Sequence, residues 1–317
     1  MKYFIPFVPF VAGWCLLMFT SSMHTISVLN GLLQLVLFLC LVCIPIWRTG
    51  RMSYVDIGWP WGLVLIGVLT FIYSDGYWMR TGIVSLAYIF VGARMGFGAL
   101  KMWKLGYLKK EFPRYEYQKI RWGKSGKTNI PLAMQIEALV QGLANASFLA
   151  IPAFIIGSNP SREFAMLEII GLLVWFGAFG VESVADVQKL KFLQAMKKAG
   201  EKNRVCNVGL WRYSRHPNYF AEWMVWNGLI IAAVPSLIAL YEVEVSLIWT
   251  LLLLGLLYAS KVMYTTLVYL TGAVSSCIFI CQRNTSASFP WRSPGVWTEA
   301  SCDATCVWVC HRDWSRL

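Results

Sequence analysis

Hydrophobic residues run along this chain in eight blocks, each about 17–26 residues long and almost free of charge. The blocks occupy residues 4–20, 26–47, 57–73, 82–100, 132–157, 165–184, 220–240 and 247–269. A helix of this length crosses a hydrocarbon layer of about 30 Å, and a helix satisfies its own backbone polar groups inside lipid. The pattern predicts an all-α fold, a multi-pass transmembrane helical bundle with about eight spans.

Two loops between the blocks, at residues 101–127 and 189–215, hold most of the Lys and Arg residues. Two predicted spans separate these loops, so both lie on one face of the membrane, and the positive-inside bias makes that face cytosolic. Eight spans then place both chain termini in the cytosol. The predicted location is an integral membrane one, the endoplasmic reticulum in a eukaryotic cell or the inner membrane in a bacterial cell.

Composition supports lipid as the main solvent. Only 14% of the residues are charged and 57% are hydrophobic, whereas soluble domains carry about 25% charged residues. The net charge of +12 raises the alternative of nucleic-acid binding. Because the basic residues are confined to loops between apolar blocks, we expect no nucleic-acid partner and assign the charge to membrane topology and an anionic cofactor.

The pattern divides the chain into three parts. Residues 1–52 form N-terminal spans, residues 53–273 form one membrane domain, and residues 274–317 form an atypical cysteine-rich tail without helical or strand periodicity. We predict that this tail is poorly ordered. A structural zinc site needs a second pair of ligands, which the tail lacks, so we predict no metal site.

Charged side chains inside membrane spans are costly, so each one is a candidate for function. Glu182 and Asp186 are four residues apart on one predicted helical face, at its cytosolic end. Two carboxylates there suit the hydroxyl and amide groups of a bound nucleotide. For Glu137 and Glu168 we favour internal pairing that holds the bundle together.

The stretch LWRYSRHPNYFAEW, residues 210–223, concentrates polar chemistry at the start of the seventh block. Pro217 suits the first position of a helix, and a helix N-terminus offers free N–H groups to an anion. The guanidinium groups of Arg204, Arg212 and Arg215 add charge that suits phosphate, and Trp211 and Tyr219 supply flat rings. The alternative is an interfacial anchor, in which the aromatic and Arg side chains contact lipid headgroups.

These residues carry a resemblance to a known family. The stretches GLWRYSRHPNYFAEW and ADVQKLKF resemble the C-terminal domain of the steroid 5-alpha-reductase superfamily. The stretches SYVDIGWPWG and EFPRYEYQKIRWG are similar to a branch of membrane proteins once labelled as a domain of unknown function. The resemblance covers about residues 53–272.

The resemblance implies a membrane reductase that binds NADPH from the cytosolic side. It assigns cofactor contacts to Glu182, Asp186, Arg204, Trp211, Arg215, His216, Asn218, Tyr219 and Glu222. The implied chemistry is hydride transfer to the β-carbon of an enone-like lipid or steroid, which is then the small-molecule substrate. Related reductases use a Glu–Tyr pair at the substrate carbonyl, and the candidates here are Asp56, Tyr54 and Tyr88.

Two other functions remain open from the sequence. A His-Pro-x-Tyr opening also occurs in membrane methyltransferases that use S-adenosylmethionine, although the Glu-Glu pair typical of those enzymes is absent beyond the last span. A non-catalytic membrane protein of the same fold is the third hypothesis, because the Glu–Tyr pair has no clean match. The sequence assigns no oligomeric state.

Overall fold

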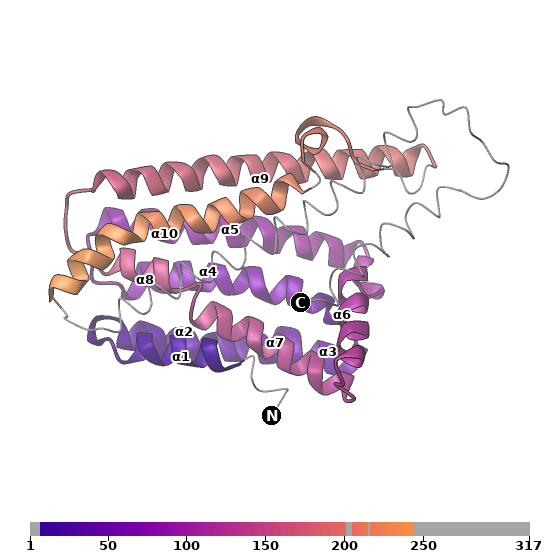
Figure 1. Cartoon of the computed structure of the whole chain (residues 1–317), viewed down its shortest axis with the longest axis horizontal. Coiled ribbons are helices and arrows are strands. Elements are labelled where there is room, and N and C mark those ends of the chain that lie inside the picture. Colours follow the sequence, from indigo (N-terminus) through magenta and orange to yellow (C-terminus); the bar gives the residue numbers. More distant parts are fainter. Residues whose placement is uncertain (1–6, 201–204, 215, 244–317) are drawn as a thin grey trace. The chain divides into compact units, whose positions relative to one another are not determined.

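The computed structural model describes residues 7–200, 205–214 and 216–243, and within them the chain is helical with no strand (Figure 1). The longer helices are α1 (Val8–Met18), α2 (His24–Phe38), α3 (Ile44–Thr49), α4 (Val55–Tyr73), α5 (Trp78–Lys104), α6 (Pro113–Lys124), α7 (Ile130–Ala146), α8 (Ile151–Gly157), α9 (Met166–Lys198) and α10 (Pro217–Val243). Short helical turns, η2 (Ser21–Met23), η3 (Leu39–Cys43), η4 (Met52–Tyr54), η5 (Tyr107–Lys109) and η6 (Gly209–Arg212), join several of them.

Six segments of the described chain are long and apolar enough to cross a membrane. They are Ser21–Thr49, Met52–Tyr73, Trp78–Lys104, Ile130–Gly157, Met166–Met196 and Pro217–Leu240. These segments coincide with six of the eight predicted spans and confirm the all-α, multi-pass fold class. The first predicted block folds as α1, which has 11 residues and is shorter than a span, and the block at 247–269 lies outside the described residues.

The contacts within the chain group it into two units. Among the described residues, the first comprises residues 7–172 and 228–243, and the second comprises residues 173–200, 205–214 and 216–227. Helices α9 and α10 are therefore each divided between the two units, α9 after residue 172 and α10 after residue 227.

Close backbone packing joins α4 and α5 in the first unit. A methyl group added at Gly92 would lie 2.5 Å from the Pro60 carbonyl oxygen, and one at Gly67 would lie 2.7 Å from the Ser85 carbonyl oxygen. Small residues at such crossings bring two helices together where lipid provides no hydrophobic driving force between them. Either position would therefore resist a larger side chain.

Polar side chains compensate for a break between α7 and α8. Asn30 Nδ2 donates to the carbonyl oxygens of Asn145 and Ala146, at 3.2 and 3.4 Å, and Tyr88 Oη donates to the Leu149 carbonyl oxygen at 2.6 Å. A helix end inside lipid leaves carbonyl groups that water cannot reach, so side chains must satisfy them. The break thus explains why the Asn30 amide is fully buried among these apolar helices.

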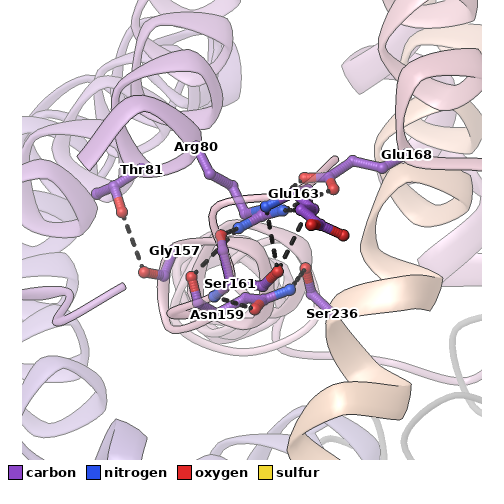
Figure 2. Close-up of polar contacts among 8 residues, drawn as sticks. All are labelled: Arg80, Thr81, Gly157, Asn159, Ser161, Glu163, Glu168 and Ser236. Atoms are coloured by element: carbon purple, nitrogen blue, oxygen red, sulfur yellow. Dashed lines mark hydrogen bonds and ion pairs between the residues drawn. The ribbon is translucent and has the colours of Figure 1, made fainter. Parts of the chain in front are cut away.

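In the first unit, a buried ion pair joins the start of α5 to the start of α9 (Figure 2). Arg80 Nε donates to Glu168 Oε1 at 2.6 Å, and both side chains are 1% exposed. The remaining guanidinium nitrogens donate to the carbonyl oxygens of Asn159, Ser161 and Glu163. This arrangement confirms the structural pairing predicted for Glu168. Glu137 accepts a hydrogen bond of 3.2 Å from Gln141 Nε2 on the same helix.

Candidate functional site

Asp56, the first candidate catalytic residue, lies in the first turn of α4. Its Oδ1 accepts a hydrogen bond of 2.7 Å from Tyr115 Oη and another from Arg114 Nη2, both from α6. The Asp56 side chain is 23% exposed. The carboxylate therefore already holds a tyrosine hydroxyl and a guanidinium group, and together they attach α6 to the start of α4.

Glu111 reinforces the same attachment from the segment before α6. Its carboxylate accepts hydrogen bonds from the backbone N–H groups of Met52 and Ser53, at 2.8 and 3.2 Å, and from Ser53 Oγ at 2.7 Å. Lys119 Nζ lies 2.8 Å from Glu111 Oε2. The carboxylate thus caps the N-terminal end of the η4–α4 segment, where a negative charge is favourable.

Burial and neighbouring charges shift the pKa values of Glu111 and Tyr115 in this cluster. Burial of Glu111 opposes its ionisation, but Lys119, the Ser53 hydroxyl and the Met52 N–H outweigh that effect and hold the pKa of Glu111 below its ordinary value. Burial, followed by the nearby Asp56 carboxylate, raises the pKa of the Tyr115 hydroxyl. Tyr115 therefore stays protonated and donates to Asp56.

The other two catalytic candidates, Tyr54 and Tyr88, lie beside different parts of α4. Tyr54 immediately precedes α4, and its hydroxyl oxygen lies 3.4 Å from Arg51 Nη2. Tyr88 packs beside Gly67, eleven residues along α4 from Asp56, which corresponds to about 16 Å of helix. The described structure therefore places Tyr54 near Asp56 and does not bring Tyr88 to them, while the catalytic roles stay predictions.

Tyr115 is the polar neighbour that sequence reasoning did not select. Half-buried and buried positions on α6 recur at Tyr115, Gln118, Lys119 and Trp122, the spacing of one face of an amphipathic helix. That spacing in the stretch EFPRYEYQKIRWG was the available signal. It shows that Tyr115 faces inward, but the pairing with Asp56, 59 residues earlier, needed the fold.

In the second unit, the turn η6 is attached to the polar end of α9. Trp211 Nε1 donates to the Ala185 carbonyl oxygen at 2.8 Å, and the Trp211 side chain is 4% exposed. The backbone N–H of Leu210 donates to Gln188 Oε1 at 2.8 Å, and Lys189 Nζ lies 4.5 Å from the centre of the Trp211 ring. Trp211 thus anchors the turn, while Gln188 is a positioning residue that sequence reasoning missed.

Helix α10 begins at Pro217, which confirms the predicted helix start. Asn218 Nδ2 donates to Asp186 Oδ1 at 3.1 Å. Asn218 Oδ1 is buried and has no hydrogen-bond partner among the residues that the structure describes. An amide oxygen in this state has the geometry to accept a hydrogen bond from a ligand, because an unsatisfied buried acceptor is otherwise costly.

The other cofactor candidates of this unit surround that pair in sequence. Glu182 lies one turn before Asp186 and is 3% exposed, and Glu222 lies one turn after Asn218 and is half-buried. His216 and Tyr219 stack with ring centres 5.1 Å apart, and Tyr219 is 40% exposed. Arg204 and Arg215 lie outside the described residues.

Within the described residues, titratable side chains do not cluster as metal ligands would. No group of three His, Cys, Asp or Glu side chains comes together in the part of the chain that the structure describes. The cysteine-rich tail at 274–317 lies outside that part.

The described residues contain six candidate spans and two polar clusters, one around Asp56 and one around Asp186 and Asn218. These features are those of a helical membrane-type protein. The chain belongs to the family described as protein of unknown function DUF1295, whose model matches residues 44–266. Comparison with curated proteins found no match, and comparison with solved structures found none either.

Proposed function

We propose that this protein is an NADPH-dependent membrane oxidoreductase that reduces the C=C bond of an enone-like lipid or steroid. The observation that carries the proposal is the Asp186–Asn218 hydrogen bond, which leaves Asn218 Oδ1 buried without a described partner. The resemblance of this stretch to the steroid 5-alpha-reductase superfamily supports the choice of NADPH.

The residues around Asn218 fit a dinucleotide. The start of α10 supplies backbone N–H groups for phosphate, and the Asn218 amide oxygen would accept from an amide or hydroxyl group. Asp186 fixes the amide orientation, because only Nδ2 can donate to its carboxylate. The exposed Tyr219 ring offers a stacking surface, and Arg204 and Arg215 are assigned to phosphate from the sequence.

When bound, NADPH would supply the hydride for the β-carbon. A proton from water or an acidic side chain would then complete the reduction at the α-carbon of the enolate. The chain would supply orientation and polar groups at the substrate. The proposal assigns the substrate carbonyl to the Tyr54 hydroxyl, because a carbonyl oxygen accepts and needs a donor. Asp56 would take part as the acid beside it, and Tyr115 holds the Asp56 carboxylate in place. Tyr88 has a different described contact, since its hydroxyl satisfies the Leu149 carbonyl oxygen at the α7–α8 break.

The test is a binding comparison between NADPH and S-adenosylmethionine, made by titration calorimetry on the full chain in detergent. Asn218→Ala should weaken NADPH binding by about tenfold or more, because a hydrogen bond to a ligand contributes on the order of 1–2 kcal/mol. Arg204→Ala should also weaken it. Asn227→Ala is the matched control, since Asn227 lies on the same helix and its Nδ2 donates to the Trp223 carbonyl oxygen at 2.7 Å.

The three hypotheses give different outcomes. NADPH binding that depends on Asn218 and not on Asn227 supports the reductase. Selective binding of S-adenosylmethionine would overturn it in favour of a methyltransferase. Saturable binding of neither compound would favour a non-catalytic membrane protein.

A further inference from the structure

Helix α6 lies across the ends of α3 and α7 in the first unit, outside the six candidate spans (Figure 1). Its inner face is packed against the bundle, where Trp122 is 5% exposed and belongs to a buried cluster with Ile46 and Met134. Lys119 Nζ also donates to the Gly50 carbonyl oxygen at 2.8 Å. The helix is therefore fixed at the level where the spans end.

The outer face of α6 and the segment before it combine apolar and basic side chains. Ile120 is 56% exposed, Trp103 is 52% exposed and Leu105 is 64% exposed. Exposed cationic residues alternate with them in the sequence. These are Lys101, Lys104, Lys109, Lys110, Arg121 and Lys124. Exposed apolar residues beside cations are typical of a helix that lies in the membrane interface.

The charge of this segment is strongly one-sided. Residues 101–127 contain nine basic and two acidic residues, a net charge of +7. One of the two acids, Glu111, is 7% exposed and is committed to Lys119 and to the start of α4. Among the residues of 101–127 whose side chains the structure describes, Glu116 is the only exposed acid. The outward surface is therefore cationic.

We propose that α6 is an interfacial helix and that the segment 101–127 binds the headgroups of anionic phospholipids in the surrounding membrane. Charge complementarity and the position at the span ends both favour this partner. Basic residues next to a membrane surface each add about 1 kcal/mol of attraction to anionic lipid, which corresponds to about a fivefold change in affinity for each charge. The proposal concerns the first unit and does not rest on NADPH binding.

The test titrates the full-length protein, in a neutral detergent, with phosphatidylglycerol and with phosphatidylcholine of the same chain lengths, and counts bound lipids by native mass spectrometry. The wild-type chain should retain phosphatidylglycerol at least tenfold more tightly. The double variants Lys109→Gln/Lys110→Gln and Arg121→Gln/Lys124→Gln should each lower that affinity by up to about 25-fold, about fivefold for each charge removed. Lys109 and Lys110 are exposed, so the thermal midpoint of the Lys109→Gln/Lys110→Gln variant should stay unchanged.

Lys191→Gln/Lys198→Gln is the matched control, because it removes two exposed charges from α9 instead. It should leave the affinity for phosphatidylglycerol unchanged. Equal retention of the two lipids by the wild-type chain would overturn the proposal, as would an equal loss in the control. Displacement of phosphatidylglycerol by millimolar inorganic phosphate would overturn it too, because the site would then bind free phosphate.

Discussion

Asn218 Nδ2 donates a hydrogen bond of 3.1 Å to Asp186 Oδ1, and this bond joins the first turn of α10 to α9 within the second unit. Asn218→Asp should destabilise the protein, because it replaces the donor with a second carboxylate about 3 Å from the first. We expect a loss of about 1–3 kcal/mol in unfolding free energy. The exchange Asp186→Asn/Asn218→Asp should recover most of the loss, because it restores one donor and one acceptor.

Thermal unfolding in detergent measures this prediction, and NADPH titration of the same variants separates fold from function. The exchanged pair should regain stability and yet bind NADPH weakly, since the amide then occupies position 186. An exchanged pair that stays as unstable as the single variant would show that the bond does not join the two helices.

Gly209 is the first residue of the anchored turn η6 and has a φ of +54°. A methyl group there would lie 2.4 Å from Gln188 Cδ. Gly209→Ala should therefore displace the turn and weaken NADPH binding by about tenfold. Adding Gln188→Ala should relieve the collision but not the backbone strain, so affinity should recover only in part. Gly200→Ala is the control, because Gly200 has a φ of +72° with no atom within 4 Å of the added methyl group.

Arg80 and Glu168 lie 88 residues apart in the chain and form the buried pair of Figure 2. Removing one partner leaves an uncompensated charge, so Arg80→Ala or Glu168→Gln should cost about 3–5 kcal/mol. Denaturant unfolding of the detergent-solubilised chain measures the loss. Arg162→Ala, at an exposed position on the adjacent loop, should change the unfolding free energy by less than about 0.5 kcal/mol.

Glu111 makes the attachment of α6 sensitive to acid. Its pKa in the folded protein lies below the ordinary value of 4.5, so its ionisation stabilises the fold above that value. This contribution is lost as the pH falls below 4.5 and through the folded-state pKa. The thermal midpoint should fall over that window, and Glu111→Gln should have a lower midpoint at pH 7 and a flatter acid limb. Glu116→Gln, at an exposed position, should retain the wild-type profile.

Sequence reasoning located the spans because the thickness of a bilayer fixes the length of an apolar helix. Six predicted blocks match candidate spans, and Pro217 marked the start of α10 because proline fits the first helical position. Both signals are local, and each can be found within one window of about twenty residues.

The partners of the polar residues could not be predicted from such local signals. Asp56 finds Tyr115 at a separation of 59 residues, and Arg80 finds Glu168 at 88. Hydropathy alone assigns no depth or azimuth to a side chain inside a bundle, so it could not select these pairs among the available acids and donors. The break between α7 and α8 was hidden for the same reason, because Asn30 and Tyr88 compensate for it from other helices.

The sequence by itself therefore determined the membrane-type helical class and the positions of most spans, and it nominated Asp186 and Asn218 as candidate cofactor contacts. Only the tertiary structure decided which groups meet, since hydrogen bonds and ion pairs depend on distances of about 3 Å. In the fold, Tyr115 donates to Asp56, and Tyr88 donates to a carbonyl oxygen at the α7–α8 break. The side-chain amide oxygen of Asn218 is buried without a described partner.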